Sequence, residues 1–294
     1  MVDPDRYIEI KKKRINRALQ NVVPDGGPPV IIRAMRYSLE AGGKRLRPVL
    51  TLAAAETFGA AEHEVIDVAC AVEMVHTYSL IHDDLPAMDD SPMRRGEPTC
   101  HCVFGEAIAV LAGDALLTHA FEVLARYGQK EFCAGKAIKI IAELAKAAGV
   151  GGMIGGQVLD LEAEGRDLTA GQIENISILK TGAMLTAAVR CGAIAAGAGE
   201  NELSILTRYA SSLGTAFQIV DDLLDIEGTA EELGKPVGSD SAHDKATYPA
   251  VFGLQEASRR AGQYHRQAVE ALEELERPAE LLRTLADKIV FRKK

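Results

Sequence analysis

The chain has 294 residues, of which 47% are hydrophobic and 26% are charged, a composition typical of a soluble globular protein. Its formal net charge of −9 argues against a general affinity for nucleic acid. We find no apolar stretch as long as a signal peptide or a membrane span, so we expect no stable membrane association.

The helical period dominates the chain. Pro48 stands early in a predicted helix at 48–58, where its missing N–H costs little. Apolar residues recur at three- and four-residue intervals in 62–82, which predicts a helix surrounded by other helices. The same pattern predicts helices at 104–127, 133–148, 170–196, 202–226 and 258–291.

Boundary signals support an all-α fold. Gly128 follows a helical run as a stop, and Thr169 with Gln172 forms a capping-box pattern. No alternating strand pattern and no Gly/Ser-rich or Pro-rich linker occurs, so we expect a single domain over residues 1–294, with about ten helices. The longest irregular stretch, at 233–249, has the length of a functional loop.

The cysteines indicate a reducing compartment and not a disulfide framework or a metal site. There are five, irregularly spaced, which disfavours a disulfide framework and favours a reducing cytoplasm. The run Cys100-His101-Cys102 could suggest zinc, but a structural zinc site needs four ligands and no second pair follows.

An acidic cluster ends the predicted helix at 62–82. Asp83 and Asp84 precede Pro86, which disfavours helix, and Asp89 follows in the stretch IHDDLPAMDD. Carboxylates at a helix C-terminus are disfavoured by the helix dipole and by mutual repulsion. A bound divalent cation would reverse both effects, and ligands that are all oxygen select Mg²⁺. For this cluster alone, a solvated acidic turn explains the pattern equally well.

A second acidic cluster favours a metal site over a solvated acidic turn. In FQIVDDLLD (217–225), the spacing places Gln218, Asp221, Asp222 and Asp225 along one side of a helix. The intervening residues are apolar, so this helix belongs to the interior and its charged stripe must face a polar cavity. The two clusters together predict Mg²⁺ that also binds a phosphate group.

Cations suited to a diphosphate accompany these acids. Lys44, Arg45 and Arg47 lie in GGKRLRP, beside a helix start that favours anions. His76 lies seven residues before Asp83, near the same helix face, which indicates that it lines the same cavity. Further candidates are Arg94, Arg95, Lys180, Lys235 and Lys245. Taken singly, each cation reads as a surface residue and His76 as a core histidine.

With these motifs the chain resembles the trans-polyprenyl diphosphate synthases, and within them the bacterial farnesyl type. The resemblance covers nearly the whole chain and is highly specific. It implies an all-α bundle around a deep central cavity, usually in a homodimer. Besides the two acidic clusters and GGKRLRP, it rests on MRRG (93–96), FGEAIAVLAGDAL (104–116), GGQVLDLEAEG (155–165), KTGAML (180–185), LGKPVGSD (233–240) and KATYP (245–249).

The resemblance implies a role for each candidate residue. Magnesium would be held from one wall by Asp83, Asp84 and Asp89, and from the other by Asp221 with Asp222 and Asp225 in support. The allylic diphosphate would be bound by Arg94, Lys180, Thr181, Gln218, Lys235 and Lys245. Isopentenyl diphosphate would be bound by Lys44, Arg47, His76 and Arg95. The catalytic set would be Asp83, Asp84, Lys180 and Asp221.

The implied reaction joins isopentenyl diphosphate to dimethylallyl or geranyl diphosphate. Mg²⁺ and the cations stabilise the departing diphosphate as the allylic C–O bond ionises. The resulting carbocation requires a cavity that excludes water. The double bond of isopentenyl diphosphate attacks, and proton loss, with diphosphate as the acceptor, gives a chain one isoprene unit longer.

Product length is predicted from the residue five positions before the first aspartate. In the resembled family this residue lies below the growing chain, where a bulky ring acts as a floor. Here it is Tyr78, with Ser79 beside it. Together with the two-residue insertion in DDLPAMD, this predicts farnesyl diphosphate (C15). The alternative is that Tyr78 only packs in the core.

Four other functions are alternatives to this one. A geranylgeranyl diphosphate synthase (C20) of the same family is the nearest, followed by a class I terpene cyclase, which typically lacks the second aspartate motif. A non-catalytic helical subunit would tend to lose aspartates that are intact here. A calcium module is disfavoured because no loop has the DxDxDG pattern.

Overall fold

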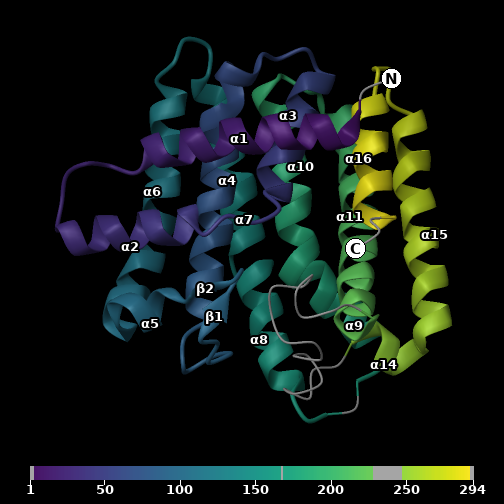
Figure 1. The fold of residues 1–294 in the computed structure, drawn as a ribbon. Coiled ribbons are helices and arrows are strands. Elements are labelled where there is room, and N and C mark those ends of the chain that lie inside the picture. Colours follow the sequence, from purple (N-terminus) through teal and green to yellow (C-terminus); the bar gives the residue numbers. More distant parts are fainter. Residues whose placement is uncertain (1–2, 167, 228–246, 292–294) are drawn as a thin grey trace.

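The computed structural model describes residues 3–166, 168–227 and 247–291. It is a helical bundle with one short antiparallel hairpin, β1 (Met93–Arg94) and β2 (Glu97–Pro98) (Figure 1). The predicted all-α fold is therefore confirmed. The first helices are α1 (Pro4–Val22), α2 (Pro29–Glu40), α3 (Leu46–Thr57), α4 (Glu62–Asp83), α5 (Cys100–Phe104), α6 (Glu106–Gly128) and α7 (Ala134–Ala148). They are followed by α8 (Met153–Ala163), α9 (Ala170–Ser177), η1 (Ile178–Gly182), α10 (Ala183–Ala195), α11 (Glu200–Glu227), α14 (Tyr248–Phe252), α15 (Leu254–Glu273) and α16 (Glu280–Val290).

The long helices run side by side and bring their functional ends together. Figure 1 shows α1 lying across the upper part of the bundle, whereas β1, β2, α8, α9 and α14 gather at the lower end. The C-terminal end of α4 points to this lower end beside the hairpin, and the C-terminal end of α11 points there beside α9 and α14. The two acidic clusters therefore lie at the same end of the molecule.

The apolar pattern of α4 explains its central place. Val65, Val68, Val72 and Val75 are each at most 1% exposed. The stripe is broad because Met74 on another side of the helix is also fully buried. A helix buried on most of its circumference is held rigidly by its neighbours, so the acids at its end have a fixed position.

Close backbone approach accounts for part of the packing between helices. A Cβ added to Gly192 of α10 would lie 2.0 Å from the carbonyl oxygen of Thr51 on α3. Likewise, a Cβ on Gly214 of α11 would lie 2.9 Å from the Cα of Gly182 in η1. These glycines let α10 meet α3, and α11 meet η1, at distances that a side chain would prevent.

Several sequence predictions differ from the structure, including the count of about ten helices, since the described residues form fourteen α-helices and one π-helical turn. The helix predicted at 258–291 is two helices, α15 and α16, because the connection between them contains Pro278. Within the described residues, two segments, Glu106–Gly128 and Ala170–Ala195, are long and apolar enough by length and composition to cross a membrane, although we expected none. In the second, 61% of the most apolar window is buried within the chain, as in a core helix.

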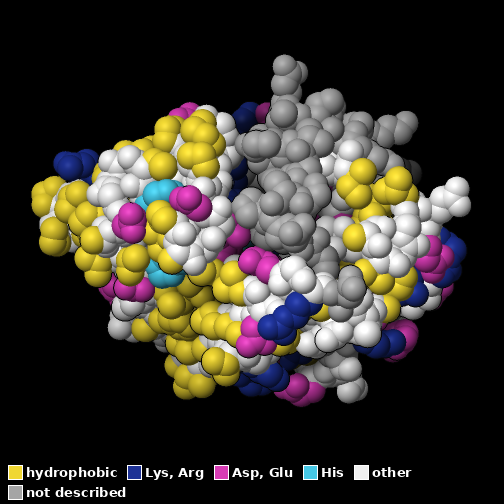
Figure 2. Space-filling model, turned by 90° about the horizontal axis from the view of Figure 1, so that it is seen from below, with side chains coloured by type: hydrophobic (Ala, Val, Ile, Leu, Met, Phe, Trp, Pro, Cys, Tyr) yellow, Lys and Arg dark blue, Asp and Glu magenta, His cyan; other side chains and the backbone are white. Residues whose placement is uncertain are grey.

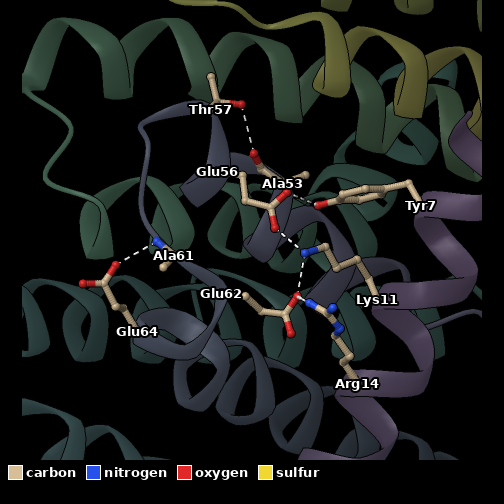
Figure 3. Close-up of polar contacts among 9 residues, drawn as sticks. All are labelled: Tyr7, Lys11, Arg14, Ala53, Glu56, Thr57, Ala61, Glu62 and Glu64. Carbon is tan, nitrogen blue, oxygen red and sulfur yellow. Dashed lines mark hydrogen bonds and ion pairs between the residues drawn. The ribbon is translucent and has the colours of Figure 1, made fainter. Parts of the chain in front are cut away.

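Polar contacts fasten α1 to the start of α4 (Figure 3). Lys11, only 7% exposed, donates to Glu62 Oε2 at 2.6 Å and also pairs with Glu56 at the end of α3. Tyr7 donates its hydroxyl to the same Glu56 at 2.9 Å, and Arg14 donates to Glu62 at 2.8 Å. This network holds α1 across the bundle, away from the acidic end.

Candidate active site

The acidic end of the molecule presents carboxylates next to apolar surface (Figure 2). After α4 ends, the chain folds back, with the Asp89 N–H donating to the Asp83 carbonyl oxygen at 2.8 Å. This turn brings Asp89 back to the end of α4. Burial raises the pKa of Asp83 to about 6, opposed by the charge of Lys180 and reinforced by that of Asp89.

Asp84 has a different environment from Asp83. It is 3% exposed, and both of its carboxylate oxygens accept from Nε of Arg94 at 2.8 Å. Arg94 Nη2 also lies 2.7 Å from Asp84 Oδ1. Burial raises the pKa of Asp84, and the hydrogen bond from Arg94 opposes that rise. The structure thus pairs a predicted magnesium ligand with a predicted diphosphate ligand.

The second cluster is organised by a chain of hydrogen bonds. Thr181 Oγ1 donates to Gln218 Oε1 at 2.8 Å, and Gln218 Nε2 donates to Asp222 Oδ1 at 2.8 Å. The other oxygen of Asp222 accepts from the backbone N–H of Tyr248 at 2.9 Å. Asp222 and Asp225 are 5% and 3% exposed. Gln218 and Asp222 of the predicted stripe on α11 therefore face η1 and the start of α14.

Cations lie between the two clusters. Lys44 Nζ is 3.9 Å from Asp221 Oδ1, so the loop before α3 reaches α11. Burial lowers the pKa of Arg47, and the charges of Glu73 and Asp221 oppose that effect. The charge of Lys180 lowers the pKa of Asp83 in the first cluster, and Lys180 also lines a cavity with Gln218 and Asp222 of the second, so this lysine lies between the two clusters. This arrangement fits binding of a polyanion between the clusters.

The residues predicted to bind isopentenyl diphosphate are grouped together. Arg47 Nη1 lies 3.1 Å from His76 Nε2. Burial lowers the pKa of His76 well below its ordinary value, and the charges of Arg47, Arg95, Arg94 and Arg45 lower it further. His76 is therefore neutral at pH 7, and the arginines supply the positive charge.

Arg95 joins this group through the glycine pair of GGKRLRP. Its Nη1 donates to the Gly42 carbonyl oxygen. A Cβ on Gly43, which has φ of 118°, would lie 2.4 Å from the guanidinium carbon of Arg95. The second glycine is required here because the backbone conformation disfavours a side chain and because the guanidinium occupies the space. By contrast, Arg45 points into the core, where it pairs with buried Glu73 at 2.6 Å.

Lys180 and Thr181 lie on a π-helical turn, η1, which interrupts the helix predicted at 170–196. Lys180 Nζ is 2.6 Å from Asp160 Oδ2 of α8. A Cβ on Gly156 would lie 2.3 Å from the Lys180 backbone nitrogen, so α8 packs directly on the turn. Such turns recur at functional sites, and this one brings Lys180 to α8 and Thr181 to α11.

A cavity of about 120 Å³, open to solvent, joins α8, α9, η1, α11 and the start of α14. Its polar lining includes Lys180, Thr181, Gln218 and Asp222, which the sequence predicted, together with Asp160 and Tyr248, which it did not. Asp160 could have been found as the single acid in the apolar stretch VLDL of a recognised motif. Tyr248 contributes through its backbone, which no side-chain pattern reveals.

The remaining candidates are placed as follows. Tyr78 is 5% exposed, its hydroxyl has no hydrogen-bond partner among the described residues, and its ring lies edge-on to His82 with 5.8 Å between centroids. Ser79 donates to the His76 carbonyl oxygen at 2.9 Å. Lys235 and Lys245 lie outside the described residues.

The donor set suits magnesium bound together with a phosphate. Within residues 3–166, 168–227 and 247–291, no three His, Cys, Asp or Glu side chains already converge on one metal position. The candidate ligands are carboxylates on two facing segments, with cations between them. A hard ion that keeps waters and takes phosphate oxygens as its other ligands fits this arrangement.

Comparisons with known proteins agree with this geometry. The chain is 47% identical over 265 residues to the farnesyl diphosphate synthase of Bacillus subtilis (strain 168), covering 90% of each chain. It is 45% identical over 287 residues to the geranylgeranyl diphosphate synthase of Cyanophora paradoxa, covering 97% of this chain and 95% of the relative. A solved geranyltransferase from Helicobacter pylori, complexed with magnesium and isoprenyl diphosphate, has a TM-score of 0.85 at 30% identity, covering 99% of this chain and 97% of that chain.

A family profile described as polyprenyl synthetase matches residues 28–285. The match includes the loop before α3, both acidic clusters and the π-helical turn. With the aspartates, the cations between them and the helical bundle in place, the chain belongs to the polyprenyl synthetase family.

Proposed function

We propose that this prenyltransferase condenses isopentenyl diphosphate with dimethylallyl and geranyl diphosphates and releases farnesyl diphosphate as its main product. The observation that carries the proposal is the position of Lys180, whose charge lowers the pKa of Asp83 and which lines one cavity with Gln218 and Asp222 of the second cluster. Magnesium held by carboxylates of both clusters would neutralise the diphosphate and promote its departure. The match over residues 28–285 supports one catalytic domain that spans most of the chain.

The chain's own residues perform the binding and orienting steps. Lys180 and Thr181 project from a turn fixed by α8 and α11, so they meet the allylic diphosphate in a set orientation. Arg47, Arg95 and Lys44 hold the second diphosphate, while neutral His76 offers a hydrogen bond without adding charge. The buried apolar side chains of α4 limit water near the reacting carbons. No described side chain improves on diphosphate as the proton acceptor.

The C15 product is supported by the position of Tyr78. Its ring is buried five residues before Asp83, one and a half turns deeper along α4 than the acidic end. A growing chain that extends from the acidic end along this helix would meet the ring. The second candidate product is geranylgeranyl diphosphate, which the similarity to the Cyanophora paradoxa synthase favours.

We also propose a homodimer in a reducing, cytoplasmic compartment. Helix α6 is long and very apolar, yet only 44% of its most apolar window is buried within the chain. Val110 and Leu111 on this helix are 40% and 54% exposed, and Val103 on α5 is 47% exposed. A second copy covering this surface would remove it from water. All five cysteines are free thiols, which supports the compartment.

One assay tests the function. Purified protein is incubated with isopentenyl and dimethylallyl diphosphates, with and without Mg²⁺, and the dephosphorylated alcohols are identified by chromatography. Magnesium-dependent farnesol is the expected result, and geranylgeraniol would identify the C20 alternative. A cyclic hydrocarbon would indicate a terpene cyclase, and no product would indicate a non-catalytic subunit.

A further inference from the structure

Arg45 is the most buried of the three cations in GGKRLRP. It is 3% exposed, whereas the Lys44 side chain next to it is 68% exposed. The backbone of Arg45 has a φ of 51°, in the left-handed region that residues other than glycine rarely adopt. Such a conformation persists only where the surrounding structure holds it, so the contacts of this side chain must fix it in place.

Three helices supply the acceptors that hold the Arg45 guanidinium. Its Nη1 lies 2.6 Å from Glu73 Oε1 on α4, and its Nε donates to Asn16 Oδ1 on α1 at 2.9 Å. Its Nη2 donates to the Leu39 carbonyl oxygen near the end of α2. The Glu73 side chain is 2% exposed, so this ion pair is buried. One side chain therefore ties the loop before α3 to α1, α2 and α4.

Glu73 also acts on the cations that are predicted to bind isopentenyl diphosphate. It lies three residues before His76 on α4, so the two side chains are neighbours on the helix surface. Arg47 in turn lies 3.1 Å from His76. Burial lowers the pKa of Arg47 and lowers that of Arg95 to about 10, and in both cases the charge of Glu73 is the largest opposing influence. One buried carboxylate thus offsets the repulsion between these arginines.

We propose that the Arg45–Glu73 pair positions the residues that bind isopentenyl diphosphate. The inference rests on the proposed function. Lys44 and Arg47 flank Arg45 in the chain, so anchoring Arg45 sets where both of those side chains begin. Arg95 donates to a backbone carbonyl oxygen of the same loop, so a displaced loop would also displace its guanidinium. The pair acts through these cations and does not itself need to touch the substrate.

The proposed allylic site provides an internal comparison. Lys180 and Thr181 lie on η1, which packs on Gly156 of α8 and is hydrogen-bonded to Gln218 of α11. None of these contacts involves the loop before α3. Loss of the Arg45–Glu73 pair should therefore affect the KM for isopentenyl diphosphate far more than the KM for dimethylallyl diphosphate.

One single and one double variant separate positioning from stability. R45M leaves Glu73 buried without its cation, so it should lose both the loop position and stability. R45M/E73L removes both charges and should recover most of the urea midpoint that R45M loses, because apolar side chains often replace a buried ion pair at little cost. In both variants we expect the KM for isopentenyl diphosphate to rise about tenfold or more, with the KM for dimethylallyl diphosphate within about twofold of the wild type.

The matched control is E143Q, which breaks an ion pair away from the site. Glu143 on α7 pairs with Arg190 on α10 at 2.6 Å, and Arg190 also donates to Thr207 near the start of α11, opposite the acidic end of that helix. E143Q should lower the urea midpoint and leave both KM values unchanged. A raised KM for isopentenyl diphosphate in E143Q would overturn the inference. So would a KM that returns to the wild-type value in R45M/E73L, since the pair would then contribute only to stability.

R45K covers the case of a variant that does not fold. Lysine keeps a positive charge beside Glu73 but lacks the planar fork that reaches acceptors on three helices. R45K should raise the KM for isopentenyl diphosphate by about threefold and leave the KM for dimethylallyl diphosphate unchanged. Two unchanged KM values would overturn the inference and leave the proposed function intact. A wild-type chain that makes no product from the two substrates would contradict the proposed function, and the inference with it.

Discussion

Lys180 Nζ lies 2.6 Å from Asp160 Oδ2, so the lysine that is to meet the allylic diphosphate already has an anionic partner. A bound diphosphate must compete with Asp160 for Lys180, and the negative charge of Asp160 also repels it. D160N should therefore tighten the binding of inorganic pyrophosphate with Mg²⁺ by about fivefold, or ~1 kcal/mol. Isothermal titration calorimetry provides the measurement.

The matched control for D160N is E162Q, which removes an exposed carboxylate two residues further along α8. It should leave pyrophosphate affinity unchanged. If D160N weakens binding, then Asp160 holds Lys180 in the orientation that the diphosphate needs, and the competition argument is wrong.

Tyr78 offers a test that separates ring size from the hydroxyl group. Its hydroxyl is buried with no hydrogen-bond partner in the part of the chain that the structure describes, so Tyr78→Phe removes a desolvated polar group and should change stability by no more than about 1 kcal/mol, in the stabilising direction. That variant should still make C15 products. Tyr78→Ala, which removes the ring, should make longer products from the same substrates. Unchanged C15 chains from Tyr78→Ala would show that the ring only packs in the core.

Lys11 should contribute far more to stability than its neighbour on the same helix. It lies between Glu56 and Glu62, which are 27% and 18% exposed, so K11M leaves two partly buried carboxylates without their shared cation. We expect a loss of about 2 kcal/mol in the free energy of unfolding. K13M, which breaks an exposed pair with Glu9, should cost less than about 0.5 kcal/mol. Urea denaturation of the two variants would measure this difference, and equal losses would contradict it.

His76 makes stability depend on pH. Burial lowers its pKa in the folded state well below that of the unfolded chain, which lies near 6.5. The unfolded state therefore binds the proton first as the pH falls. The stabilisation from neutral His76 is present above about pH 6.5 and is lost below it, with a slope of up to about 1.4 kcal/mol per pH unit.

The measurement is the free energy of unfolding at several pH values between 7.5 and 5. The stability of H76Q relative to the wild type should increase as the pH falls through this window. H63Q, which replaces an exposed histidine near the start of α4, should follow the wild-type curve. Parallel curves for H76Q and the wild type would show that His76 titrates normally in the folded chain.

The sequence predicted the helices and the end of α4 well because both depend on local signals. Apolar spacing defines α4 and α11, and Pro86 marks where the first of them stops. The sequence also predicted that both acidic clusters would lie in one region, since the charged side of each buried helix needs a polar cavity to face. The break near Pro278 was missed because an apolar period continues on both sides of it.

The hydrogen-bond partners of Asp84 and Asp222 could not be predicted from the sequence. Whether Asp84 faces an ion or an arginine depends on how the hairpin folds back, and Arg94 is ten residues away. Asp222 finds its partner in the backbone of Tyr248, and every residue other than proline carries such a donor. Residue types give the inventory of donors and acceptors, whereas only the folded chain decides how they pair.

Gly43 and Arg95 lie so close that substitutions at the two positions are not independent. A methyl group at position 43 would collide with the guanidinium, and the left-handed backbone there adds strain. In a combinatorial library that randomises both sites, active clones with arginine at 95 should carry glycine at 43. A shorter residue at 95 removes the collision but not the backbone strain, so larger residues at 43 should be rare, and should be recovered only with a shorter residue at 95 in clones with reduced affinity for isopentenyl diphosphate.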